Sequence, residues 1–372
     1  MERRTFGKGK SNKKSEIVRY IFKCKNASKT ELTKVLEISM PTVLQSTKEL
    51  LEQGILQEAG EYESTGGRRA KSLTINGNKA YAAGMDITGN HVSFVLINLK
   101  GEIISYEVLW KDFNDSLAYY REIFQELEAF IERHGLKEDN ILGVGVALPG
   151  IIDRDEKVLI KSHALKLENF GLSLIAQMCT RVLHFENDTN AAMEAECTLA
   201  EGDAIYLFLS RTVGGAFRTD GDIFRGNNRK AGELGHTILV PGGRICQCGT
   251  KGCVNAYCSI QALEKASGYS LEETMARVAA KDPQVLPVWN EYLDYLAITV
   301  SNLRMMYDTD IILGGDMSAY LEPYMLDLGK RVMEINKFDR DIGYLKISKL
   351  KKGGAAAGAA LRFIHKYISE IC

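Results

Sequence analysis

Apolar residues recur at helical spacing in three short segments near the N-terminus. In residues 15–24 this spacing predicts a helix with Ser15 as its N-cap. A second helix is expected after Ser28, because Glu31 follows at the position that completes a capping box. Its apolar face would consist of Leu32, Val35 and Leu36. After a short turn Ser39 is expected to cap a third helix, and this order is typical of a helix-turn-helix.

The third predicted helix is the one that a helix-turn-helix places in the major groove of DNA. We expect its outward face to carry Met40, Thr42, Val43, Gln45, Ser46 and Lys48. Of these, the candidates for DNA contact are Thr42, Gln45, Ser46 and Lys48. The opposite face should belong to the core, with Leu44, Leu50 and Leu51.

Residues 55–76 alternate between apolar and polar positions and turn at glycines, which predicts a β-hairpin wing. Arg68, Arg69 and Lys71 in this segment are suited to contacts with phosphate or with the minor groove. The alternative is a protein-interaction domain whose arginine pair is only solvated. Because a single winged helix makes few DNA contacts, we expect a homodimer, or a dimer of such dimers, that binds a near-palindromic operator in double-stranded DNA.

Two later segments share one order of strand, glycine turn, strand, polar turn and strand. They are residues 81–104 and 204–224. A repeat of this kind predicts a duplicated α/β unit with two lobes, and the cleft between the lobes is the expected ligand site. The chain then divides into a winged helix-turn-helix domain with a basic arm (1–76), a first lobe (77–197) and a second lobe (198–372) whose C-terminal helices return to the first.

Charge is unevenly distributed along the chain. Residues 1–76 contain 15 Lys or Arg against 9 Asp or Glu, a net +6, although the whole chain carries a net −1. A basic N-terminal domain on an acidic body indicates a polyanionic partner for the first domain. No run of about eighteen apolar residues occurs and the N-terminus is basic and polar, so we expect a cytoplasmic protein without a membrane segment.

Candidate metal ligands gather in one segment, where GELGH at 232–236 precedes CQCGTKGC at 246–253. The four ligands would be His236, Cys246, Cys248 and Cys253. Thiolate and imidazole groups at such short spacings suit tetrahedral zinc. Because four protein ligands leave no open position for water, the zinc would be structural rather than catalytic. For the cysteines alone, buried thiols or a disulfide are the alternatives.

This segment resembles the signature of the ROK family (repressors, open reading frames and sugar kinases), in which GELGH is followed by CxCGxxGCxE. Supporting motifs extend from Met85 to Leu361. The resemblance implies an actin-like, hexokinase-like body of ribonuclease H-like type. It also implies two opposite functions, because some members phosphorylate sugars and others carry a DNA-binding domain and repress transcription.

The resemblance further implies a ligand site. Asp188 occupies the position of the general base in the family's kinases. The positions that contact sugar hydroxyls in the family correspond to Asn187, Glu233 and His236. Gly150 ends a buried strand and offers an exposed amide to a hydroxyl. Asn255 stands where the family has a glutamate, and an amide in place of a carboxylate changes which hydroxyl pattern the site satisfies.

The phosphate side departs from the family's kinases. Residues 86–90 read DITGN in place of DxGGT, and residues 210–216 read SRTVGGA in place of GTGIGGG. Side chains at glycine positions obstruct a close backbone approach to phosphate, so we expect no kinase activity, although Arg211 could still attract phosphate. The sequence predicts a sugar-responsive regulator, a repressor of carbohydrate-metabolism genes. The alternatives are a sugar kinase with an appended DNA-binding domain and a regulator controlled by a protein partner.

Overall fold

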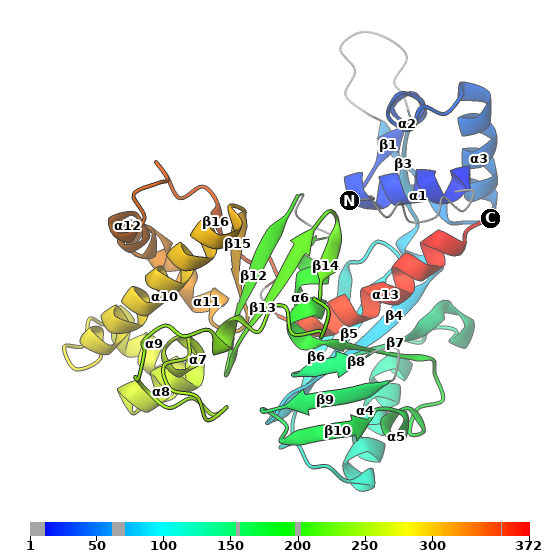
Figure 1. Cartoon of the computed structure of the whole chain (residues 1–372). Coiled ribbons are helices and arrows are strands. Elements are labelled where there is room, and N and C mark those ends of the chain that lie inside the picture. The colour runs from blue at the N-terminus through cyan, green and yellow to red at the C-terminus, as the bar shows by residue number, and fades with distance from the viewer. Residues whose placement is uncertain (1–11, 62–70, 154–156, 198–201, 351) are drawn as a thin grey trace.

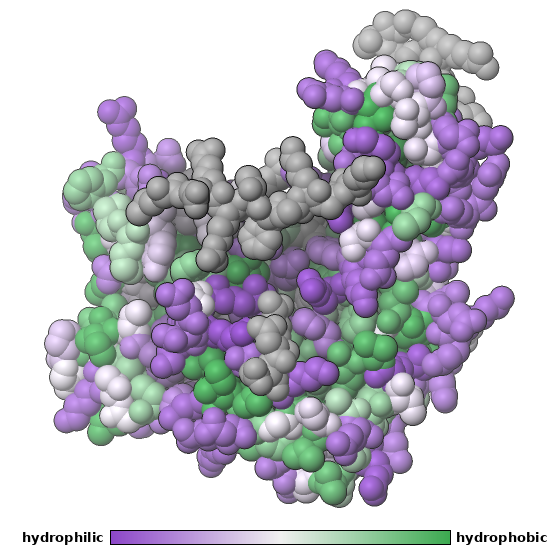
Figure 2. Space-filling model, turned by 45° about the vertical axis from the view of Figure 1, so that its right-hand side comes forward, coloured by the Kyte–Doolittle hydropathy of each residue, from purple (hydrophilic) through white to green (hydrophobic). Residues whose placement is uncertain are grey.

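The computed structural model describes residues 12–61, 71–153, 157–197, 202–350 and 352–372 (Figure 1). An N-terminal unit of three helices and a small antiparallel sheet, ordered β1-β3-β2, projects from a larger body. Its elements are α1 (Lys13–Cys24), β1 (Ala27–Ser28), α2 (Lys29–Leu36), α3 (Met40–Glu52), β2 (Leu56–Glu61) and β3 (Lys71–Ile75). The order of three helices followed by the paired strands β2 and β3 is the order that the sequence predicted for this unit. The surface view shows many hydrophilic side chains on this unit (Figure 2).

Local capping fixes where these helices begin. Ser28 and Glu31 form the predicted capping box at the start of α2, and the Ser39 side chain accepts a hydrogen bond from Thr42 N at the start of α3, also as predicted. The predicted cap of the first helix is wrong. Asn12 caps α1 by accepting from Lys14 N, and Ser15 lies buried inside the helix.

The rotational phase of α3 also differs from the prediction. Val43 and Ser46 are buried on its inner face, whereas Leu44 is 47% exposed. The inner face is a stripe at positions 43, 46, 47 and 50, and Thr47 stabilises it by donating its hydroxyl to Val43 O. Val35 of α2, expected in the core, is likewise exposed. The prediction that Ser46 contacts DNA bases is therefore wrong, because its side chain is buried and cannot reach them.

The first lobe is built on a five-stranded sheet with the order β11-β7-β4-β5-β6. Its strands are β4 (Tyr81–Ile87), β5 (His91–Asn98), β6 (Ile103–Trp110), β7 (Ile141–Leu148) and β11 (Leu183–Asn187). Helix α4 (Leu117–Glu132) packs its apolar face on one side of the sheet. A small antiparallel sheet joins this lobe, formed by β8 (Ile151–Asp153), β9 (Val158–Ser162) and β10 (Leu167–Gly171).

The second lobe repeats the same strand order as β14-β13-β12-β15-β16. Its strands are β12 (Ala204–Leu209), β13 (Val213–Thr219), β14 (Asp222–Phe224), β15 (Asp310–Gly314) and β16 (Leu345–Ile347). In both lobes three antiparallel strands are followed by two strands parallel to the first, which confirms the predicted duplication. Helices of the second lobe include α7 (Asn255–Cys258), α8 (Ile260–Ser267), α9 (Leu271–Ala279), α10 (Leu286–Tyr307), α11 (Ser318–Leu321) and α12 (Met325–Ile335).

The C-terminal helix α13 (Gly354–Glu370) crosses back to the first lobe and packs on β4, β7 and α6 (Asp188–Cys197) (Figure 1). Its far end contacts the N-terminal unit: the His365 ring meets Phe22 of α1 edge to face, with centroids 5.4 Å apart. Lys14 of α1 also donates to the carbonyl of Cys372, at 3.0 Å. One buried cluster of apolar side chains runs through α1, α3 and α13 without a break. Helix α13 therefore joins the N-terminal unit to the body.

No helix in the described part of the chain combines the length and the apolar character that a membrane crossing requires.

Candidate functional site

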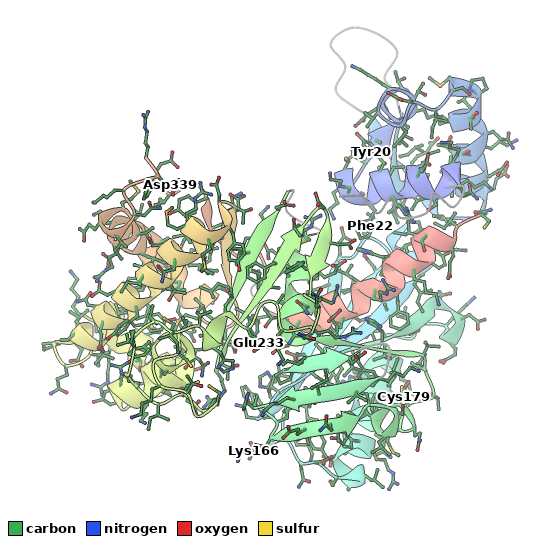
Figure 3. All side chains as sticks on the ribbon, viewed as in Figure 1. Tyr20, Phe22, Lys166, Cys179, Glu233 and Asp339 are labelled. Atoms are coloured by element: carbon green, nitrogen blue, oxygen red, sulfur yellow. The ribbon has the colours of Figure 1, made fainter. Side chains whose placement is uncertain are left out.

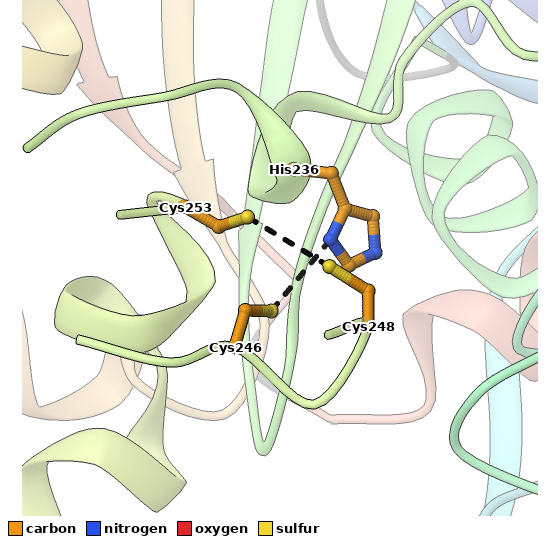
Figure 4. A group of neighbouring side chains, drawn as sticks. All are labelled: His236, Cys246, Cys248 and Cys253. Atoms are coloured by element: carbon orange, nitrogen blue, oxygen red, sulfur yellow. Dashed lines mark hydrogen bonds between the residues drawn. The ribbon is translucent and has the colours of Figure 1, made fainter. Parts of the chain in front are cut away.

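The four predicted metal ligands lie together in the second lobe (Figure 4). Their ligand atoms all lie within 4.8 Å of one another. The Sγ atoms of Cys248 and Cys253 are 3.8 Å apart, and His236 Nδ1 is 3.8 Å from Cys246 Sγ. Two sulfurs bound to one tetrahedral zinc would be about 3.8 Å apart, given Zn–S bonds of about 2.3 Å. The donor set and its spacing therefore fit a tetrahedral metal ion.

Backbone geometry holds the loop around these ligands. Gly252 has φ +89°, and a Cβ there would lie 1.9 Å from Val240 O. Only glycine fits this position without strain.

Asn255 is buried at the start of α7 and connects the loop to the cavity wall. Its Nδ2 donates to Cys246 Sγ at 3.6 Å, and its Oδ1 accepts from Val213 N at 2.7 Å. Asn255 was expected to contact the effector. Its amide atoms are already engaged, so this geometry favours a supporting role for it.

A cavity of about 400 Å³ lies between the lobes. The six residues that the sequence predicted as ligand contacts all line it, namely Gly150, Asn187, Asp188, Glu233, His236 and Asn255. They come from both lobes: β7 ends before Gly150, β11 and α6 meet at Asn187 and Asp188, and the 3-10 helix η3 (Leu234–His236) follows Glu233. In Figure 3 Glu233 lies between the two lobes. The fold thus brings together around one cavity residues that are distant in the sequence.

Asp188 is held at the N-terminus of α6 by its neighbours. Its Oδ1 accepts from Thr189 N at 2.7 Å and from Asn187 Nδ2 at 3.1 Å, and the same Asn187 amide donates to Gly150 O at 2.9 Å. Burial raises the pKa of Asp188 to about 6, and the charge of Glu233 adds to the rise, while the Thr189 donors oppose it. Asp188 thus lines the cavity with a carboxyl group that its neighbours hold in place.

His236 faces both the metal cluster and the cavity. Its Nδ1 points to Cys246, at 3.8 Å, and its Nε2 lies 3.9 Å from Glu233 Oε2. The two ring nitrogens can therefore serve different partners, a metal on one side and the cavity carboxylate on the other. The predicted metal cluster and the cavity therefore share His236, and Cys248 of the cluster lines the cavity as well.

A smaller cavity of about 200 Å³ occupies the phosphate side, next to Asp188. Side chains fill much of its wall: Ser210 donates to Asp316, the Thr88 hydroxyl lies 2.9 Å from His91 Nδ1, and Arg211 pairs with Glu264 at 3.4 Å. Burial raises the pKa of Asp86 well above its usual range, and the charges of Asp188 and Asp316 add to the rise. Three carboxyl groups, those of Asp86, Asp188 and Asp316, therefore line this cavity together with Arg211.

On the N-terminal unit, α3 exposes the remaining predicted DNA contacts, Thr42, Gln45 and Lys48. Gln45 donates to Glu49, which also pairs with Lys14 at 2.5 Å. Lys71 lies at the start of β3, and Arg68 and Arg69 lie outside the described residues. The exposed apolar residues Met40 and Leu44 share the outer face of α3. This face therefore presents apolar and polar side chains together.

The sequence model of the ROK family matches residues 82–365, most of the chain. The chain belongs to the ROK family. A xylose repressor from Caldicellulosiruptor bescii is 27% identical to it over 380 residues, which cover 95% of each chain. The DNA-binding transcriptional dual regulator NagC of Escherichia coli is 25% identical over 243 residues, which cover 64% of this chain and 60% of NagC.

Among solved ROK structures, a transcriptional regulator described as a homologue of the E. coli MLC protein matches 96% of this chain and 98% of its own, with a TM-score of 0.74 and 19% identity. A ROK hexokinase from Thermus thermophilus matches 76% of this chain and 97% of its own, with a TM-score of 0.59 and 25% identity. The regulator therefore shares the whole architecture, whereas the kinase matches a smaller part of the chain.

The ROK motifs did not indicate every residue at the cavity. Its wall also contains Glu186 of β11 and four basic residues, Lys161, Arg225, Arg229 and Lys230. Glu186 belongs to the family-like stretch FENDTNAAMEAE at 185–196, but no motif marks the four basic positions. For Arg225, Arg229 and Lys230 the available signal was the polar run RGNNRK at 225–230, one residue before GELGH, because a loop leading into a ligand motif is close to the same site.

Proposed function

We propose that this ROK protein is a sugar-responsive transcriptional repressor of carbohydrate-metabolism genes. The observation that carries the proposal is the junction at α13, where a winged helix-turn-helix unit shares one buried core with a ROK body. That body has a cavity lined by Asn187, Asp188 and Glu233. The match to the xylose repressor over 95% of both chains supports the same conclusion.

In this proposal the N-terminal domain, residues 1–76, binds an operator in double-stranded DNA. Thr42, Gln45 and Lys48 lie on the exposed face of α3 and meet base edges or nearby phosphates, and the wing contributes Arg68, Arg69 and Lys71. A homodimer, or a dimer of dimers, supplies two copies for the two halves of a near-palindrome. The lobes 77–197 and 198–372 close on the effector.

The metal cluster, in this proposal, holds a structural zinc. Three thiolates and an imidazole at tetrahedral spacing support zinc, and four protein ligands leave no position for an activated water. When bound, zinc would cross-link the loop 246–253 to His236 and so fix one wall of the cavity. We therefore assign the metal to the shape of the effector site, not to chemistry on the effector.

Signal transfer is proposed to run from α6 through α13 to α1. Asp188 begins α6 at the cavity, Ala191 one turn later contacts Gly358 of α13, and His365 near the other end of α13 meets Phe22 of α1. Helix α6 therefore contacts α13 directly, and α13 contacts α1 directly. The zinc loop lies at the effector end of this route, since His236 reaches the cavity.

The experiment begins with selection of operator sequences from random DNA, followed by anisotropy measurements of operator binding with a panel of sugars. We expect a near-palindromic operator, and at least one sugar that changes its affinity by about 5-fold to 150-fold, the usual range for coupled sites. Asp188→Ala should keep operator binding and lose the response. Failure to enrich any operator, with the body folded, would contradict the proposal.

A sugar kinase is the second candidate, favoured by Asp188 at the base position. Coupled assays of ATP consumption with a hexose panel test it. We expect no turnover, because Asp316 and Ser210 bond to each other within the phosphate-side cavity. Turnover that disappears in Asp188→Ala would instead establish the kinase.

A further inference from the structure

His365 of α13 lies where three helices meet. Its Nδ1 is 3.5 Å from Glu194 Oε1 of α6, and its ring meets Phe22 of α1 edge to face, with centroids 5.4 Å apart. Figure 3 shows Phe22 between α1 and α13. Lys25, just after α1, also approaches the Phe22 ring, with Nζ 5.7 Å from its centroid. A change in the charge of His365 therefore acts on the contact that joins the N-terminal unit to the body.

The second ring nitrogen of His365 is enclosed without a partner. Nε2 is buried and, among the described residues, has no hydrogen-bond partner. Neutral histidine has a single N–H, which at Nδ1 faces Glu194, whereas protonated histidine has an N–H at both ring nitrogens. A buried donor without an acceptor costs free energy. The junction as it stands therefore favours the neutral form of His365.

Charged groups of both signs surround His365. Burial lowers its pKa below the ordinary value, and the charge of Glu194 opposes this change. The positive charges of Arg362 on the same helix and Arg19 on α1 lower the pKa further. A cavity of about 140 Å³ adjoins His365, and its other titratable or charged lining residues include His184, Glu186, Asp222 and Arg225. The surroundings of His365 thus also favour its neutral form.

Resting on the proposed function, we propose that His365 is a pH-sensitive switch for operator binding. Neutral His365 fits against Phe22 and keeps α1 docked on α13. Protonated His365 needs an acceptor for its second N–H, and water reaches the buried Nε2 when Phe22 moves away. Protonation thereby releases the winged helix unit from the body, and two released units lose the fixed spacing that a near-palindrome requires.

The direction of the pH effect follows from the linkage between docking and protonation. In the docked state the pKa of His365 lies below its ordinary value of 6.5, and undocking exposes the ring and returns the pKa toward 6.5. The docked state therefore binds fewer protons. Docking keeps its full stability above pH 6.5 and loses stability as the pH falls through this value, and operator affinity should fall in the same window.

The test measures operator affinity by anisotropy on the full chain without effector, at constant ionic strength, between about pH 7.5 and about pH 5.5. His365→Gln should bind the operator like the wild type at the higher pH, and lose about threefold or more less affinity than the wild type at the lower pH, since each unit of pKa difference is tenfold in affinity. All proteins compared keep Asp188, whose pKa of about 6 lies in the same range.

His134→Gln is the matched control. His134 is exposed just after α4 and contacts Phe130, so its loss removes one histidine away from the junction and should leave the pH dependence unchanged. His184→Gln tests the other histidine of the adjoining cavity, and it too should keep the pH dependence of the wild type.

NMR of isotope-labelled histidines measures the pKa of His365 directly, and the signal missing from His365→Gln identifies the residue. Bound operator should lower this pKa, because the coupling between two binding events is reciprocal. Phe22→Leu, which shortens the side chain packed on the ring, should raise the pKa toward 6.5 without any DNA present.

The outcomes separate this inference from the proposed function. An unchanged pH dependence in His365→Gln, or its loss in His184→Gln instead, would overturn the switch and leave the sugar-responsive repressor standing. A pKa of His365 that is the same with and without operator would overturn it as well. If no operator is selected, the proposed function fails. In that case a pKa of His365 that Phe22→Leu leaves unchanged would show separately that the junction does not control this residue.

Discussion

Gly358 marks the closest contact between α13 and α6. A Cβ at this position would lie 1.6 Å from Ala191 O and 2.4 Å from Ala191 C. Both are backbone atoms, so no side-chain rotation can relieve the overlap. Gly358→Ala must therefore move one helix away from the other, and this movement should disturb both the stability of the body and the position of Asp188.

The size of the effect follows from the distance. Carbon and oxygen atoms in contact normally lie about 3.3–3.5 Å apart, so the helices must separate or bend by roughly 2 Å. Extra methyl groups in a well-packed core typically cost ~1–3 kcal/mol. The contact with rigid backbone places this site at the upper end of that range, and the gain in helix propensity from Gly to Ala, about 1 kcal/mol, offsets only part of it. We expect a net destabilisation of about 2 kcal/mol.

Gly354→Ala is the matched control on the same helix. A Cβ there would be 3.7 Å from the nearest atom, in Leu350, which is an ordinary contact. This substitution should be neutral or stabilise the protein by up to about 1 kcal/mol.

Urea unfolding measures both stabilities, and calorimetry with the effector measures the second consequence. Because α6 begins at Asp188 and Ala191 lies one turn later, Gly358→Ala should also weaken effector binding, whereas Gly354→Ala should not. If Gly358→Ala were as stable as the wild type and bound the effector equally well, α6 and α13 would not be coupled as the structure indicates.

Three further predictions concern the cavity, the metal and DNA. Asp188→Asn should stabilise the effector-free protein as pH rises: burial raises the pKa of Asp188 from 3.8 to about 6, so its ionisation opposes folding above 3.8. In urea unfolding, the free energy of unfolding of Asp188→Asn should exceed that of the wild type by ~3 kcal/mol above about pH 6.5, by about half as much near pH 5, and not at all below the unfolded pKa. A difference between the two proteins that does not change with pH would contradict this prediction. Elemental analysis should find about one zinc per chain, lost in Cys248→Ser and kept in the exposed-cysteine control Cys372→Ser; full zinc content in Cys248→Ser would exclude the site. Gln45→Ala should reduce discrimination at one position of each half-site by ~1–3 kcal/mol, and Ser46→Ala, which alters a buried side chain, should leave base preference unchanged in binding assays with systematically changed operators.

Features set by neighbouring residues were predictable from the sequence. The capping box at Ser28 and the cap at Ser39 each depend on atoms within three residues, and the structure has both. The spacing of Cys246, Cys248 and Cys253 likewise restricts how far apart the thiols can lie. The repeated strand pattern predicted the duplicated sheet, because the three antiparallel strands that open each half are joined by short connections.

Features set by tertiary packing were not predictable in this way. On α3, the sequence offers apolar residues at both Val43 and Leu44, and only packing against the rest of the N-terminal unit decides that Val43 is inside. The basic wall of the cavity combines Lys161 with Arg225, which are 64 positions apart and on different lobes. The contact between α1 and α13 joins the two ends of the chain, and no local pattern indicates it.

Helix α6 is tied to both lobes, and this determines how an effector can act. At its C-terminal end, buried Glu196 accepts from Ser348 Oγ at 2.7 Å and from Lys349 N at 3.1 Å, just after β16 of the second lobe. At its N-terminal end, Asp188 faces the cavity, and along its length it packs on α13. The lobes therefore cannot change their separation without a force on α6, and α13 passes part of it to α1. An effector shifts operator affinity only by the difference between its affinities for the two separations, typically about 1–3 kcal/mol.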